Sequence, residues 1–172
     1  MAIKPILTAP DPRLKAVSTS VETVDAATRK LIDDMVDSMY EADGIGLAAV
    51  QIGTPQRIIV MDLDQKDGKK APRHFINPVI TWRSEEVATF EEGCLSVPEI
   101  WDDVERAARI KAEYLDRDGK HHAIEADGLL ATCLQHEMDH LEGILFIDHL
   151  SKLKRSMALR KLQKAKRLRD AG

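Results

Sequence analysis

The chain has 172 residues, 44% of them hydrophobic, and a formal net charge of −4, which suits a single globular core. No Pro/Gly/Ser-rich linker divides it, and two cysteines are too few for a disulfide framework. The first residues contain no apolar signal region and no apolar run approaches about 18 residues, so we expect a cytoplasmic protein without a membrane span.

The first half of the chain predicts one helix followed by short strands. Asp25 is a candidate N-cap for a helix whose apolar residues recur at helical spacing from Leu31 to Met39, and Gly44 is placed to terminate it. Residues 57–61, 74–80 and 87–90 have the composition of short strands.

Later segments complete an α+β pattern. Residues 109–115 and 121–124 flank a turn-forming segment and predict a hairpin. Asp127 is a candidate cap for a helix that runs to about Leu141, before Gly143. The predicted fold is therefore α+β, with short antiparallel strands around this central helix, an N-terminal helix and a basic C-terminal helix.

The central helix contains the segment His136-Glu137-Met138-Asp139-His140. Histidines four residues apart point to the same side of a helix, where they can bind one divalent metal. Glu137 flanks that point and can take a proton from water and return it to a leaving group. The alternative is an exposed helix with two solvated histidines. The adjacent pair His121-His122 is not interpreted as a metal site, because neighbours on a strand point to opposite faces.

A catalytic site of this kind needs a third protein ligand. The long metalloprotease motif places a histidine at a position that is Phe146 here, which disfavours that class of peptidase. Cys133 shares the helical face of His136 and His140, but its neighbours are typical of a buried helix. Cys94 lies in a loop or strand end from which a thiolate can reach the helix. The chemistry favours Cys94 and leaves Cys133 open.

Three segments together resemble one family, the peptide deformylases. They are Gly44-Ile45-Gly46-Leu47-Ala48-Ala49-Val50-Gln51, Glu92-Gly93-Cys94-Leu95-Ser96 and Gln135-His136-Glu137-Met138-Asp139-His140. Their order and spacing are those of the family, and the resemblance extends over essentially the whole chain. It implies a metal-dependent hydrolase of protein biosynthesis that removes the formyl group from N-formyl-methionine of nascent polypeptides and releases formate. It also implies that Cys94, His136 and His140 hold the metal, with Cys133 as a wall residue.

The resemblance implies further roles around the metal. The oxyanion that forms on the formyl group would be stabilised by the Gln51 side-chain amide and the Leu95 backbone N–H. Glu137 would carry the proton to the departing amine. Geometry alone suits zinc, whereas the family implies Fe²⁺ as the working metal, with Zn²⁺, Ni²⁺ or Co²⁺ as substitutes.

The resemblance also implies how the substrate peptide binds. The peptide would lie extended between residues 44–47 and the strand after Cys94, and glycines permit its close approach. An apolar pocket would select the methionine side chain, with Ile45, Phe90, Leu129 and Cys133 as its walls, and ordinary core packing is the alternative for these four residues. Trp101 follows closely enough to border the cleft. The expected substrate-binding residues are Gly44, Ile45, Gly46, Phe90, Leu129 and Cys133.

The charge is concentrated at the C-terminal end. Residues 151–172 contain nine Lys or Arg against Asp170 alone, a balance of +8, whereas residues 1–150 have a balance of −12. The tail predicts a helix with apolar residues near one side, namely Leu150, Leu153, Met157, Leu162, Ala165 and Leu168. We expect residues 1–150 to form the catalytic deformylase domain and residues 151–172 a helical extension of it that contacts the ribosome surface. A solvated helix is the alternative.

Two other functions remain open from the sequence. A general zinc metallopeptidase is possible if Cys94 is not the third ligand, and it would cleave unformylated peptides. The basic tail also allows a non-catalytic ribosome- or RNA-binding protein. Glu137 argues against the second alternative, because a structural metal site needs a fourth protein ligand and no base.

Overall fold

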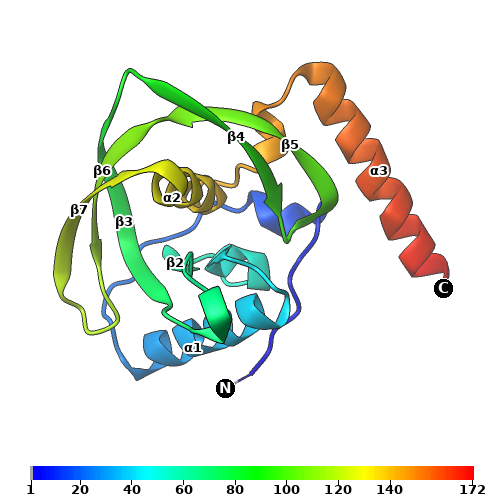
Figure 1. Ribbon diagram of the computed structural model, residues 1–172. Helices are drawn as coiled ribbons and strands as arrows, with labels where there is room; N and C mark the ends of the chain where they lie inside the picture. The colour runs from blue at the N-terminus through cyan, green and yellow to red at the C-terminus, as the bar shows by residue number, and fades with distance from the viewer. Residues whose placement is uncertain (1) are drawn as a thin grey trace.

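The computed structural model describes residues 2–172, and Met1, the first residue of the expected catalytic domain, lies outside the described residues. Figure 1 shows the chain from the N-terminus in blue to the C-terminus in red. The elements follow in the order η1 (Pro12–Lys15), α1 (Ala26–Glu41), β1 (Gly46–Ala48), η2 (Ala49–Ile52), β2 (Ile58–Met61), η3 (Lys66–Gly68), β3 (Arg73–Arg83), β4 (Val87–Cys94), β5 (Val97–Ala107), β6 (Arg109–Leu115), β7 (His121–Asp127), α2 (Gly128–Leu141), η4 (Phe146–His149) and α3 (Lys152–Ala171).

Two antiparallel sheets surround α2, which confirms the predicted α+β class. One sheet has five strands in the order β1-β2-β3-β6-β7, and β4 and β5 form the other. In Figure 1 the pair β4 and β5 arches over α2, while β3, β6 and β7 flank it. The core around α2 includes Ile59, Phe75, Ile110, Ala131, Leu134 and Leu141.

Helix α1 forms where the sequence predicts it. The Asp25 carboxylate accepts a hydrogen bond from Thr28 N at 2.9 Å, which satisfies one of the free N–H groups at the helix start. Ile32, Met35 and Met39 lie on one face and are buried against β1 and β2. This packing holds the segment after α1, which begins the glycine-containing motif, close to the core.

Helix α2 also lies where the sequence predicts it, but its ends are formed differently. Asp127 occupies the N-cap position, yet its side chain makes no capping hydrogen bond, so that detail of the prediction is wrong. Gly143 ends the helix with a φ of 74°, a conformation that glycine adopts without strain. A Cβ at Gly143 would lie 2.4 Å from Lys15 O, so the glycine also permits the N-terminal segment to pass closely.

Composition predicts no strand at the position of β5, although the family resemblance implies a strand after Cys94. Its central residues Asp102, Asp103 and Glu105 resemble a polar loop. In the structure exposed Asp103 and Glu105 alternate with buried Val104 and Arg106, which face α2 and the body, because β4 and β5 form a two-stranded sheet with one covered face.

Helix α3 packs along the edge of the body beyond β5 (Figure 1). Ser151 caps it, and Ala158 and Leu162 are buried with Val97 and Phe146. Among the apolar residues predicted near one side, Leu162 is buried, whereas Leu153, Met157 and Leu168 are exposed. None of the helices among the described residues combines the length and the apolar character that a membrane span requires.

Candidate metal centre and active site

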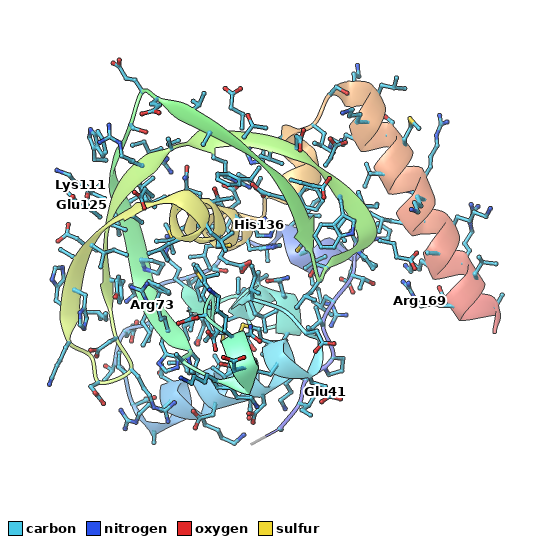
Figure 2. All side chains as sticks on the ribbon, viewed as in Figure 1. Glu41, Arg73, Lys111, Glu125, His136 and Arg169 are labelled. Carbon is cyan, nitrogen blue, oxygen red and sulfur yellow. The ribbon has the colours of Figure 1, made fainter. Side chains whose placement is uncertain are left out.

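Helix α2 and the end of β4 bring three metal-binding side chains together. Cys94, His136 and His140 each offer one ligand atom, and these atoms lie within 4.8 Å of one another. Cys94 Sγ is 3.3 Å from His140 Nε2. Figure 2 shows His136 on α2, in the interior that the strands enclose. One thiol and two imidazoles at this spacing fit a divalent cation in a tetrahedral site.

The orientation of the two rings agrees with a ligand role. His136 Nδ1 donates to Glu92 Oε1 at 2.8 Å, which leaves Nε2 with its lone pair directed at the site. His140 is completely buried, and burial lowers its pKa well below the ordinary value. A neutral imidazole is the form that binds a metal.

The two cysteines have different surroundings. Cys94 belongs to the cluster of ligand atoms, whereas Cys133, one turn before His136, lies outside that cluster. Burial raises the pKa of the Cys133 thiol to about 12, so it stays protonated at neutral pH. The geometry therefore brings together the thiol that the sequence chemistry favoured and leaves the other in the wall of the adjoining cleft.

Glu137 lies beside the ligands in an almost fully enclosed position. Its Oε1 is 3.7 Å from His136 Nε2, and its Oε2 is buried without a hydrogen-bond partner among the described residues. Burial raises the pKa of Glu137 to about 7. A Cβ at Gly46 would lie 3.2 Å from the Glu137 carboxyl carbon, so a glycine there lets β1 approach the carboxylate closely. The group is poised to exchange protons near neutral pH.

Gln51 is held from two sides next to the thiol. Its Oε1 accepts a hydrogen bond from Ala48 N at 2.8 Å, and its Nε2 donates to Ser96 Oγ at 2.9 Å. The same Nε2 lies 3.6 Å from Cys94 Sγ. Leu95 follows Cys94 directly, so its backbone belongs to the same edge of the site. Ser96 belongs to a motif recognised in the sequence, but its contact with Gln51 was not predicted.

A cleft of about 460 Å³ opens beside the metal ligands. All six expected substrate-binding residues line it: Gly44, Ile45, Gly46, Phe90, Leu129 and Cys133. Ile45, Phe90 and Leu129 are 44%, 37% and 49% exposed, which is inconsistent with ordinary core packing. Trp101 also lines the cleft, and a Cβ at Gly93 would lie 2.3 Å from its indole ring. An apolar cleft thus ends at the site that holds the candidate ligands and Glu137.

The sequence profile of the family described as polypeptide deformylase matches residues 3–156. This chain belongs to the peptide deformylase family. It is 56% identical to the peptide deformylase of Rhizobium meliloti (strain 1021) over 171 residues, which cover 99% of this chain and 98% of that relative. It is 58% identical to the peptide deformylase of Phenylobacterium zucineum (strain HLK1) over 164 residues, 95% of this chain and 97% of that relative.

Solved structures agree with the sequence matches. A crystal structure of a peptide deformylase from Legionella pneumophila has a TM-score of 0.91 and 49% identity, and the match covers 99% of both chains. The peptide deformylase of Ehrlichia chaffeensis in complex with actinonin also gives a TM-score of 0.91, at 46% identity over 97% of this chain and 99% of that one.

The protein is thus an enzyme that removes the formyl group from the N-terminal methionine of nascent peptides. The similarities do not support a general zinc metallopeptidase or a non-catalytic ribosome- or RNA-binding protein. A metal-binding group of Cys94, His136 and His140 is present, as the deformylase family leads one to expect.

Proposed function

We propose that this deformylase holds one Fe²⁺ per chain through Cys94, His136 and His140, and that Zn²⁺, Ni²⁺ or Co²⁺ can replace it. The convergence of these three ligand atoms within 4.8 Å at the end of the apolar cleft supports the ligand set, and membership of the deformylase family supports Fe²⁺ as the ion. When bound, such a cation supplies Lewis acidity and lowers the pKa of a water molecule toward neutrality.

Glu137 serves as the proton carrier of the reaction. Its carboxylate takes a proton from the attacking water and passes it to the amine that leaves, and a pKa of about 7 suits both transfers. The Gln51 amide and the Leu95 backbone N–H donate to the oxygen on which negative charge develops. Gln51 is neutral and does not compete for the cation.

The substrate backbone lies extended between residues 44–47 and the hairpin of β4 and β5. Main-chain pairing of this kind does not depend on sequence, which suits an enzyme that processes many different chains. The methionine side chain occupies the pocket walled by Ile45, Phe90, Leu129 and Cys133. The exposure of Ile45, Phe90 and Leu129 in the cleft, which Cys133 also lines, supports this assignment.

Formate release from a formyl-methionyl peptide and from its acetyl analogue tests the substrate assignment. The extra methyl group should crowd the region between Glu137 and Gly46, where even a Cβ added to the glycine would lie only 3.2 Å from the carboxyl carbon. We expect hydrolysis of the formyl peptide and little of the acetyl one. Equal rates would point to a general amidase.

Glu137→Gln tests the proton carrier separately. This variant should keep its metal and lose turnover by roughly 10² to 10⁴, because it removes proton transfer without removing a ligand. Turnover near the wild-type value would exclude Glu137 from this role.

We also propose that residues 1–150 form the catalytic domain in the cytoplasm and that residues 151–172 extend it toward the ribosome. The support is the +8 balance of this segment, together with exposed Leu153 and Met157 on α3. Co-sedimentation with ribosomes should weaken as salt rises and should weaken further in the double variant Lys164→Glu with Arg167→Glu. The matched pair Lys66→Glu with Lys69→Glu, on η3 and the residue after it, should behave as wild type. Equal binding by both double variants would contradict a contact through α3.

A further inference from the structure

A continuous chain of side-chain hydrogen bonds, which includes the ion pairs of Arg106 with Glu92 and Asp139, connects His136 with the protein surface. His136 Nδ1 donates to Glu92 Oε1 at 2.8 Å. Arg106 donates two hydrogen bonds to the same carboxylate, through Nε at 2.7 Å and Nη2 at 3.0 Å. Arg106 Nη1 donates to Asp139 Oδ2 at 2.8 Å. His149 Nε2 donates to that same Oδ2 at 2.7 Å. Five side chains thus form one path from a candidate metal ligand to an exposed imidazole.

The path joins four elements that are separate in the sequence. Glu92 lies on β4, Arg106 on β5, Asp139 on α2 and His149 at the end of η4, just before α3. The side chains of Arg106 and Glu92 are only 6% and 5% exposed, so neither charge can be compensated by water if its partner is removed. The buried Arg106 and Glu92 therefore depend on each other for charge compensation.

Arg106 determines where the Glu92 carboxylate lies. Glu92 Oε1 accepts from both His136 Nδ1 and Arg106 Nη2, so the position of this oxygen sets the tautomer and the orientation of the His136 ring. All three guanidinium nitrogens donate hydrogen bonds, two to Glu92 and one to Asp139. A lysine ammonium cannot reproduce this planar fork.

We propose that Arg106 and His149 are positioning residues for the metal ligand His136. His149 holds Asp139 Oδ2, which fixes the third nitrogen of Arg106, and Arg106 in turn fixes the carboxylate that orients the ring. The inference rests on the proposed ligand set, and its test separates the two.

A second histidine–aspartate pair provides a matched control. His122 Nε2 donates to Asp116 Oδ2 at 2.6 Å, and these side chains are 44% and 27% exposed, close to the 38% and 22% of His149 and Asp139. His122 lies on β7, and within the described part of the chain the side-chain hydrogen bonds of this pair stay among residues 116–122. Removal of His122 therefore reproduces the loss of a surface pair without touching the path to His136.

The experiment measures Co²⁺ affinity by competition with a chelator, and the visible absorption spectrum of the Co²⁺-loaded enzyme. Arg106→Lys should weaken Co²⁺ binding by roughly tenfold and change the spectrum, because the ring of His136 is no longer held in one orientation. His149→Ala should weaken binding by about threefold in the same direction. His149→Gln, which keeps an N–H donor, and His122→Ala should match the wild type.

The outcomes separate a positioning role from a purely structural one. If Arg106→Lys and His149→Ala lower Tm but keep the wild-type Co²⁺ affinity and spectrum, the chain of hydrogen bonds only holds the elements together and the proposal is overturned. If Arg106→Lys does not fold, the comparison of His149→Ala with His149→Gln and His122→Ala decides alone. Failure of the ligand set would look different, because His136→Ala would then retain tight Co²⁺ binding.

Discussion

The side-chain amide of Gln51 donates a hydrogen bond to Ser96 Oγ at 2.9 Å, and both side chains are buried. The N-terminal segment runs beside both residues, since Leu7 N donates to Gln51 O at 2.7 Å and Ala9 N donates to Ser96 O at 2.8 Å. The proposed oxyanion donor is therefore held by side-chain and backbone contacts before any substrate binds. Such preorganisation is what makes a donor effective in the transition state.

Ser96→Ala should lower kcat by roughly tenfold and leave KM nearly unchanged, because the Gln51 amide loses the partner that directs it. Steady-state kinetics on a short formyl peptide provides the measurement. Ser18→Ala is the matched control, since the Ser18 hydroxyl is buried without a hydrogen-bond partner among the described residues. A rise in KM at constant kcat would show that Ser96 acts on substrate binding instead.

The reactivity of Cys133 follows from its surroundings. Because burial raises the pKa of this thiol to about 12, only a very small thiolate fraction exists at neutral pH, and the fraction grows as pH rises. In a Cys94→Ser background, the rate of alkylation should stay slow and increase about tenfold per pH unit between about pH 7 and pH 9. A rate that levels off by about pH 9 would indicate an ordinary thiol.

Helix α3 should contribute to the stability of the body. Leu162 is buried with Val97 and Phe146, so Leu162→Ala should lower the free energy of unfolding by about 2 to 5 kcal/mol. Leu168, on the same helix, is 66% exposed, and Leu168→Ala should have almost no effect. Urea denaturation of both variants makes the comparison, and equal effects would mean that α3 does not pack as described.

Local signals explain which parts of the fold could be predicted. The cap Asp25 and the helical spacing of apolar residues predicted α1. The four-residue spacing of His136 and His140 predicted the face of α2 that carries the metal ligands. Composition did not predict strand β5, because Asp103 and Glu105 are exposed while Val104 and Arg106 are buried on the other face, and the covering of that face is a property of the tertiary structure. The sequence likewise placed the apolar residues of α3 near one side without indicating which of them are covered, and β5 and η4 cover Ala158 and Leu162.

The sequence likewise identified some residues of the candidate site and missed others. Spacing on one helix nominated His136, Glu137 and His140, and chemistry favoured Cys94. The residues that orient them were not identified, because their partners are distant in sequence or in another element. Arg106 meets Glu92 from the neighbouring strand and Asp139 from α2, and His149 reaches Asp139 from η4. Such contacts depend on how the elements pack and have no local sequence pattern.

Metal content after anaerobic purification tests the proposed ligand set most directly, in the wild type, Cys94→Ser and Cys133→Ser. The wild type and Cys133→Ser should each carry about one iron per chain, whereas Cys94→Ser should carry almost none, because Cys94 is the cysteine whose Sγ lies within 4.8 Å of both histidine ligand atoms. Retention of iron by Cys94→Ser together with its loss from Cys133→Ser would contradict this assignment.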